Sequence, residues 1–194
     1  MRELREDLRL IYDWIAPNSK VLDLGCGDGQ LLAALVEEKN CICDGVEVDT
    51  DSVIAAMDLG VNVIQSDLES GLRHGFTDNS FDVVVLSQTI QAMKNTEIIL
   101  QEMKRVARQA IVTFPNFGYW RNRLQIAQGR MPVSESMPYE WYNTPNIHWC
   151  TLADFDALCE KNGLAVLERT VMSGGKRIDF LPNLLGSLAF YRVG

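Results

Sequence analysis

The sequence predicts an α/β fold, a Rossmann-like doubly wound sheet of seven mostly parallel strands, on three observations. Short apolar runs alternate with segments whose apolar residues recur at helical spacing, which is the order of strands and helices in this class. A glycine-rich loop joins the first strand to a helix. Acidic residues stand at the ends of three strands, where open parallel sheets bind ligands.

The chain opens with an amphipathic helix. Leu4, Leu8, Ile11 and Ile15 recur at helical spacing with charged residues between them, and Pro17 ends the pattern. We expect this helix to pack on the sheet or to cover a ligand.

The stretch 21–30, Val-Leu-Asp-Leu-Gly-Cys-Gly-Asp-Gly-Gln, indicates a strand, a tight turn and a helix. Such a turn directs the free N–H groups and the positive end of the helix at a ligand above the strand. Gly25, Gly27 and Gly29 would let that ligand approach the backbone. We expect Cys26 to be a small filler beside it.

Two ligand classes use this kind of loop, nucleotide pyrophosphates and S-adenosylmethionine. The dinucleotide fingerprint G-x-G-x-x-G requires a third glycine where this chain has Gln30. Asp23 and Asp28 would repel a pyrophosphate but suit the ammonium and sulfonium cations of S-adenosylmethionine. The loop therefore favours S-adenosylmethionine over a nicotinamide dinucleotide. Asp28 also suits the N-cap of the next helix, a role compatible with ligand contact.

The next three strands are expected to end at the same edge of the sheet. The second, 43–49, carries Glu47, placed 22 positions after the first loop glycine. A carboxylate there can accept hydrogen bonds from both hydroxyls of a ribose. The third strand, 61–67, ends at Asp67, and the fourth, 81–87, ends at Ser87 and leads to Gln88.

The remaining elements continue the alternation. A helix opened by Asp51 or Ser52 follows the second strand, and later helices separate strands at 110–114, 165–171 and 188–193. Four leucines at helical spacing precede the last strand, and we expect them in the core unless they form an exposed docking stripe: Leu181, Leu184, Leu185 and Leu188.

Residues 115–150 break the pattern, because they hold seven of the 16 aromatic residues and four of the six prolines. A long aromatic insertion after the fifth strand indicates a substrate pocket or lid, or else a local cover packed on its own aromatics. Arg121 and Arg123 suit either a carboxylate or a surface strut. The candidate substrate contacts are Asn116, Tyr119 and His148.

Composition limits the partners and the location. The formal net charge of −8 argues against nucleic acid as a partner, because phosphate binding needs a basic patch. At 194 residues the chain is long enough for one well-buried domain and short for two, so we expect one domain, 1–194. It has no long apolar run and no apolar signal core, so we expect it in the cytoplasm, with no membrane contact. The five cysteines form no C-x-x-C pair, which favours reduced thiols and no metal site.

Together these residues resemble class I S-adenosylmethionine-dependent methyltransferases over nearly the whole chain. The motifs of the first three strands carry this general resemblance, with Gly45-Val-Glu-Val-Asp49 and Ser66-Asp-Leu68. Within that superfamily the chain resembles the MetW family of methionine biosynthesis. The narrower likeness rests on Ser87-Gln-Thr-Ile-Gln-Ala92, Phe114-Pro-Asn-Phe-Gly-Tyr-Trp120 and Thr144-Pro-Asn-Ile-His148.

The resemblance implies that the last strand is antiparallel and that S-adenosylmethionine is the cofactor. It implies that the glycine loop surrounds the amino-acid part, Glu47 the ribose, Asp67 and Leu68 the adenine, and Ser87 to Thr89 the methyl group. The implied cofactor residues are Asp23, Gly25, Cys26, Gly27, Gly29, Glu47, Val48, Asp67, Leu68, Ser87 and Gln88. No catalytic residue is assigned, because alignment of the reacting atoms can suffice.

Two functions are compatible with this family. One is methyl transfer to a small molecule in methionine biosynthesis. The alternative is a non-catalytic accessory subunit that binds a homoserine O-acyltransferase and supports or regulates it.

Overall fold

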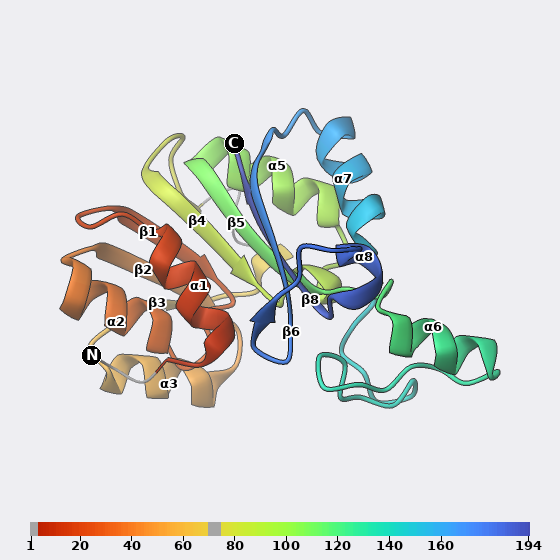
Figure 1. The fold of residues 1–194 in the computed structure, drawn as a ribbon. Coiled ribbons are helices and arrows are strands. Elements are labelled where there is room, and N and C mark those ends of the chain that lie inside the picture. Colours follow the sequence, from red (N-terminus) through yellow and green to blue (C-terminus); the bar gives the residue numbers. More distant parts are fainter. Residues whose placement is uncertain (1–3, 70–74) are drawn as a thin grey trace.

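A computed structural model describes residues 4–69 and 75–194, and its core is one eight-stranded sheet in the order β3-β2-β1-β4-β5-β8-β6-β7 (Figure 1). The strands are β1 Lys20–Leu24, β2 Ile42–Glu47, β3 Asn62–Gln65, β4 Phe81–Ser87, β5 Ala107–Pro115, β6 Val166–Ser173, β7 Lys176–Arg177 and β8 Leu188–Val193. The predicted α/β class is confirmed. Beyond the seven expected strands, the two-residue β7 pairs with β6 at one edge.

Strands β3, β2, β1, β4 and β5 pair in parallel. β8, the last strand, lies between β5 and β6 and is antiparallel to both, as expected. The interior of β4, residues 83–86, is buried throughout, as expected for a strand with both sheet faces covered.

Helices cover both faces of the sheet. They are α1 Glu6–Trp14, α2 Gln30–Lys39, α3 Thr50–Asp58, η1 Ile90–Ala92, α5 Thr96–Val106, α6 Trp120–Ala127, α7 Leu152–Lys161 and α8 Pro182–Leu185. Ile11 of α1 and Leu32 of α2 belong to one apolar cluster with Val85. Met103 of α5 and Phe155 of α7 belong to the other with Val84. Because side chains of a strand alternate between faces, neighbouring valines serve opposite cores.

Two local predictions were wrong. Asp49, rather than Asp51 or Ser52, caps α3, and its side chain accepts a hydrogen bond from the Ser52 N–H at 2.9 Å. Three of the four leucines are not core residues, because α8 is a single turn without a buried residue and Leu181 is 52% exposed, whereas Leu188 packs, partly buried, against the core. The chain enters β8 at Leu188, so the helical spacing in the sequence does not correspond to one helical face.

The aromatic insertion extends from the edge of the sheet (Figure 1). Near its C-terminal end, the insertion is hydrogen-bonded to the segment after β4. The Ile147 and His148 N–H groups donate to the Gln91 carbonyl at 2.8 and 2.9 Å. Some of its aromatic rings pack in pairs, with ring centres 5.6 Å apart for Phe117 and Trp149 and 5.7 Å apart for Trp141 and Tyr142, but its large apolar side chains are mostly exposed. Those at least 38% exposed are Trp120, Leu124, Ile126, Met131, Val133, Tyr139, Trp141, Tyr142 and Ile147.

Within the described ranges, no helix is both long enough and apolar enough to cross a membrane.

Candidate functional site

The carboxyl ends of three neighbouring parallel strands bring the predicted acids to one edge of the sheet. Asp23 lies near the end of β1, Glu47 ends β2, and Asp67 follows β3. The register fixes this alignment, since Asp23 pairs with Gly45, and Glu47 pairs with Gln65. Ser87 ends the adjacent β4 at the same edge.

The three glycines of the loop are needed for different structural reasons. All have left-handed φ angles, +77° at Gly25, +54° at Gly27 and +75° at Gly29. A Cβ at Gly25 would lie 2.8 Å from Thr89 Oγ1, and one at Gly29 would lie 2.8 Å from Ala56 Cβ. A Cβ at Gly27 would meet nothing within 4 Å. Two of the glycines therefore allow close packing, and only Gly27 borders open space for a ligand.

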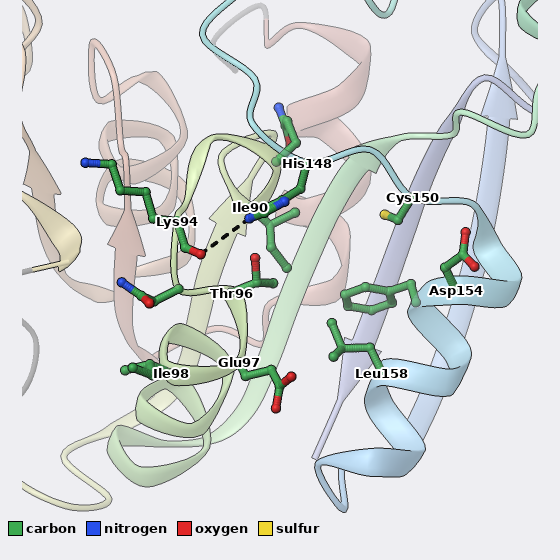
Figure 2. Close-up of a pocket in the computed structure, with 12 residues that line it drawn as sticks. Ile90, Lys94, Thr96, Glu97, Ile98, His148, Cys150, Asp154 and Leu158 are labelled. Carbon is green, nitrogen blue, oxygen red and sulfur yellow. Dashed lines mark hydrogen bonds between the residues drawn. The ribbon is translucent and has the colours of Figure 1, made fainter.

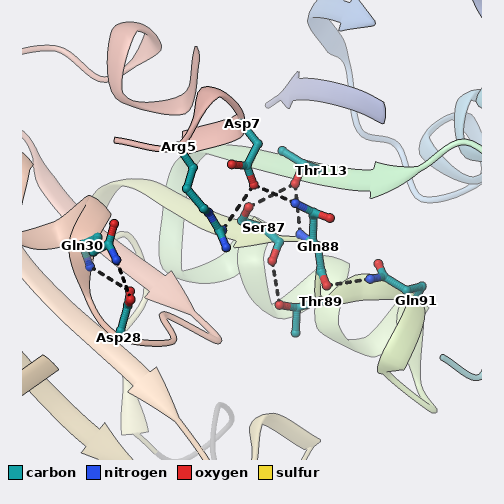
Figure 3. A network of polar contacts seen from close by, with 9 residues as sticks. All are labelled: Arg5, Asp7, Asp28, Gln30, Ser87, Gln88, Thr89, Gln91 and Thr113. Carbon is teal, nitrogen blue, oxygen red and sulfur yellow. Dashed lines mark hydrogen bonds and ion pairs between the residues drawn. The ribbon is translucent and has the colours of Figure 1, made fainter. Parts of the chain in front are cut away.

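The N-cap of α2 is Gly29, so the prediction that Asp28 caps this helix was wrong by one residue. Asp28 still contacts the helix start. Its carboxylate accepts from Gln30 Nε2 at 2.6 Å and, weakly, from the Gln30 N–H at 3.4 Å (Figure 3). The exposed Asp28 thus places negative charge beside the loop.

Asp23 is a buried acid with an unused oxygen. The residue is 3% exposed, and its Oδ1 has no hydrogen-bond partner within the described part of the chain. Burial, and next the negative charge of Glu47, raise its pKa from 3.8 to about 7. A bound cation would stabilise the ionised form of this carboxyl. The site therefore fits a positively charged ligand and disfavours a phosphate.

Cys26 packs inside the loop and is not a nucleophile. The residue is 9% exposed, and a Cβ on Gly45 would lie 2.6 Å from its Sγ. Burial, and then the charges of Asp23 and Glu47, raise the pKa of its thiol to about 12. The thiol is therefore neutral near pH 7, and thiols in this form are inert.

Glu47 ties the glycine loop to the end of β2. Its Oε2 accepts from the Gly27 N–H at 2.9 Å, while Oε1 accepts from the N–H groups of Val48 and Asp49 at 2.8 and 3.0 Å. A carboxylate offers about four acceptor positions, and these contacts fill three. To hold two ribose hydroxyls, Glu47 would have to loosen one of these bonds.

Asp67 and Leu68 border a small cavity of about 40 Å³ at the ends of β2 and β3. Asp67 Oδ1 accepts from the Glu69 N–H at 3.0 Å, and Leu68 is buried. The wall is mostly apolar with one acid, a lining that suits an aromatic base, but the cavity would have to widen to enclose one. It is lined by Val46, Ile64, Ser66, Asp67, Leu68, Gly75 and Phe76.

The segment after β4 is held by a polar network (Figure 3). Gln88 has a left-handed φ of +49°, and its N–H lies 3.0 Å from both the carbonyl and Oγ1 of Thr113. Its Nε2 donates to Asp7 Oδ2 at 2.7 Å. The first turn of α1 is thus attached to the end of β4.

The three candidate substrate contacts have different surroundings. Asn116 is fully buried, and its side chain binds the Asn183 and Gly186 carbonyls and the Gly118 N–H. A substrate contact needs an accessible atom, so we assign Asn116 a structural role. Tyr119 is the N-cap of α6.

His148 lines a separate cavity of about 490 Å³ between α5 and α7 (Figure 2). Its Nε2 lies 3.3 Å from the Lys94 carbonyl. The cavity floor includes Ile90, Phe155 and Leu158. His148 nevertheless borders the segment after β4, because its N–H donates to the Gln91 carbonyl at 2.9 Å and Gln91 Nε2 donates to the Gln88 carbonyl at 2.6 Å.

The cavity that does adjoin Gln88 is formed by residues that the sequence did not indicate. It has a volume of about 460 Å³ and is lined by Arg5, Glu6, Asp7, Gln88, Glu135, Ser136, Met172, Ser173, Gly174, Gly175, Ser187, Leu188 and Phe190. Five segments that are distant in the sequence meet there, and no local pattern marks them. In the described part of the chain, no group of three or more His, Cys, Asp or Glu could hold a metal ion.

Solved structures with this fold include proteins of different function. A crystal structure of an S-adenosylmethionine-dependent methyltransferase from Thermotoga maritima aligns with a TM-score of 0.69 and 19% identity, covering 97% of this chain and 86% of that one. The [4+2]-cyclase SpnF aligns with a TM-score of 0.70 and 16% identity, covering 96% and 79%. These likenesses establish the methyltransferase-type fold, and function has to be argued from the site.

Comparison with related sequences identifies the family, which the likeness of fold does not. The bifunctional methionine biosynthesis protein MetXA/MetW of Rhodopirellula baltica is 37% identical over 206 aligned residues, which cover 97% of this chain and 33% of that protein. The chain thus spans about a third of that relative's length. The model of the family described as methionine biosynthesis protein MetW matches residues 5–193. The chain belongs to the MetW family.

Proposed function

We propose that the protein binds S-adenosylmethionine at the carboxyl edge of β1 to β4 and directs methyl transfer to a small molecule in the cavity beside Gln88. The proposal rests on the buried Asp23 carboxyl, whose Oδ1 has no hydrogen-bond partner in the described part of the chain. This carboxyl lies near the end of β1, just before a glycine loop that is open at Gly27. A cationic ligand with a ribose and a base fits the charges and the cavities at this edge better than a pyrophosphate.

Each part of the ligand has a candidate partner. Asp23 and the Gly27 backbone would hold the amino-acid part, Glu47 the ribose, and Asp67 with Leu68 the base. When bound, S-adenosylmethionine supplies an electrophilic methyl group on a sulfonium. The bonds of Gln88 to Thr113 and Asp7 hold the end of β4 in a fixed position, and such positioning can supply much of the rate.

The ribose assignment is tested with Glu47→Gln rather than Glu47→Ala. Alanine would also remove the acceptor of the Gly27, Val48 and Asp49 N–H groups, whereas glutamine keeps one acceptor oxygen. We expect S-adenosylmethionine to bind to Glu47→Gln about 10- to 100-fold more weakly, because charge-assisted hydrogen bonds to the hydroxyls are lost. Calorimetry measures the affinity, and Glu37→Gln on the surface of α2 is the control. Unchanged affinity would remove Glu47 from the site.

The raised pKa of Asp23 predicts pH-dependent binding. In the free protein this carboxyl titrates near pH 7, and a bound cation would lower its pKa. Binding should therefore release a proton below about pH 7 and tighten as the pH rises from 5.5 to 7.5. Calorimetry in two buffers of different ionisation enthalpy counts the proton.

Asp23→Asn should remove this proton release. In the absence of ligand, the same raised pKa makes the folded state less stable as the pH rises, which is opposite to its effect on cation binding. The unfolded state loses its Asp23 proton near pH 4 while the folded state keeps it, so this residue lowers stability as the pH rises from about 4 to 7. A urea titration series should show the dependence in the parent and not in Asp23→Asn. Identical proton release in both proteins would contradict the assignment.

Catalysis is tested by incubating the protein with S-adenosylmethionine carrying a labelled methyl group and a metabolite extract. We expect one labelled small molecule, and its yield should fall with Glu47→Gln. If the cofactor binds but a broad metabolite panel gives no labelled product, the second candidate is favoured.

The second candidate is an accessory subunit for a homoserine O-acyltransferase. It is favoured by the Rhodopirellula relative, whose name assigns MetXA and MetW functions to one polypeptide. The exposed aromatics of the insertion supply a contact surface, with Trp141 70% and Tyr142 69% exposed. Aromatic residues are enriched where protein interfaces concentrate their binding energy.

Co-expression with the acyltransferase tests this role. We expect the two proteins to co-purify, and a Trp141→Ala and Tyr142→Ala double variant to weaken the complex by tenfold or more. Acyltransferase activity is measured with and without this protein. No co-purification and unchanged acyltransferase activity would return the balance to a free-standing methyltransferase.

A further inference from the structure

We propose that the cavity beside the end of β4 recognises a small protonated amine, so that the methyl acceptor is an amine nitrogen. This inference rests on the proposed function, because it names the acceptor class for the same site. The cavity is about 460 Å³, large enough for a small metabolite.

Its walls combine apolar surface with acids. Met172, Leu188 and Phe190 line one part of the cavity. Glu6 and Asp7 belong to the first turn of α1. Such a lining suits an apolar body that carries a polar head group.

The charge of the lining selects the sign of that head group. It includes three carboxylates, of Glu6, Asp7 and Glu135, and a single guanidinium, of Arg5. Arg5 Nη2 lies 3.3 Å from Asp7 Oδ2, so its charge is already matched. With three carboxylates against one guanidinium, the lining keeps an excess of negative charge, which attracts a cation and repels a carboxylate or phosphate.

The arginines that could have recognised a carboxylate lie elsewhere. Arg123 Nε donates to the Gly118 carbonyl, and the Arg121 guanidinium lies 5.4 Å from the centre of the Trp120 ring. Neither lines this cavity. Arg123 instead lines a different cavity, with Arg169 and Asn183.

Asp7 is the carboxylate that the fold positions best. Its side chain is 14% exposed, and its Oδ2 accepts from Gln88 Nε2 at 2.7 Å as well as from Arg5. Both of these hydrogen bonds are made by Oδ2. An ammonium bound to this carboxylate would lie beside Gln88, which follows the end of β4 (Figure 3).

Methyl transfer to the amine balances in atoms and charge, with the groups present. The ammonium first loses one proton to water or to an exposed carboxylate such as Glu6 or Glu135. The free nitrogen lone pair then forms the N–C bond as the C–S bond breaks, and that bonding pair passes to the sulfur, which becomes a neutral thioether. The product nitrogen carries the positive charge until a proton leaves. No oxidant or reductant is needed.

Three probes of similar shape test the inference: phenethylamine, phenethyl alcohol and 3-phenylpropionate. Their binding is measured by NMR titration of the full chain saturated with S-adenosylhomocysteine, whose own binding is first measured by calorimetry. We expect the amine to bind at least tenfold more tightly than the alcohol, and the carboxylate more weakly than both. Labelled S-adenosylmethionine should then give labelled N-methylphenethylamine.

Asp7→Asn removes the charge but keeps an oxygen for Gln88 Nε2. It should weaken amine binding about tenfold and leave alcohol binding unchanged, as expected for loss of a charge-assisted hydrogen bond. Asp13→Asn on the same helix, whose side chain is 57% exposed and which lies outside the cavity, is the matched control. If Asp7→Asn does not fold by circular dichroism, Glu135→Gln on the exposed insertion replaces it, with a smaller loss in the same direction.

Equal binding of amine and alcohol, or no probe binding when S-adenosylhomocysteine binds, would overturn the amine assignment and leave the proposed function standing. Failure of S-adenosylhomocysteine to bind would instead defeat the proposed function itself, and with it this inference. An unaltered amine affinity in the folded cavity variant would also overturn it.

Discussion

The parallel register of β1 with its neighbours β2 and β4 is the constraint on which the rest of the structure depends. It aligns the ends of these strands, and the apolar residues along them bury both faces of the sheet. A shift by one residue would exchange the two faces. The register therefore fixes the glycine loop, Glu47 and Ser87 at one edge, and the fold and the site have a common physical cause.

The two acids nearest the loop are held in opposite ways. Glu47 accepts three backbone N–H groups, whereas Asp23 is buried with one oxygen lacking a described partner. Negative charge is therefore compensated at Glu47, and the proton remains on Asp23 up to about pH 7. A cation at this edge would let Asp23 ionise as well. This asymmetry gives the free site an electrostatic preference for positively charged ligands.

Contacts between distant segments supply the rest of the site. The Gln88–Asp7 hydrogen bond joins residues 81 positions apart and attaches α1 to the end of β4. The exposed insertion leaves its aromatic surface outside this network. The two proposed roles therefore use different surfaces: the strand ends and the cavity beside Gln88, which includes Glu135 of the insertion, for methyl transfer, and the exposed aromatics of the insertion for a protein partner.

The sequence by itself determined the α/β class, the glycine turn and the acids at the strand ends, because local periodicity and strand–loop–helix order depend on neighbouring residues. It placed Asp23, Glu47, Asp67 and Ser87 at one edge, since parallel strands align their carboxyl ends. Only the tertiary structure decided that Asn116 is a buried strut, that the α8 leucines are not core, and that Asp7 and Glu135 share a cavity with Gln88. These outcomes depend on packing between residues far apart in the chain, and such packing leaves no periodic signal in the sequence.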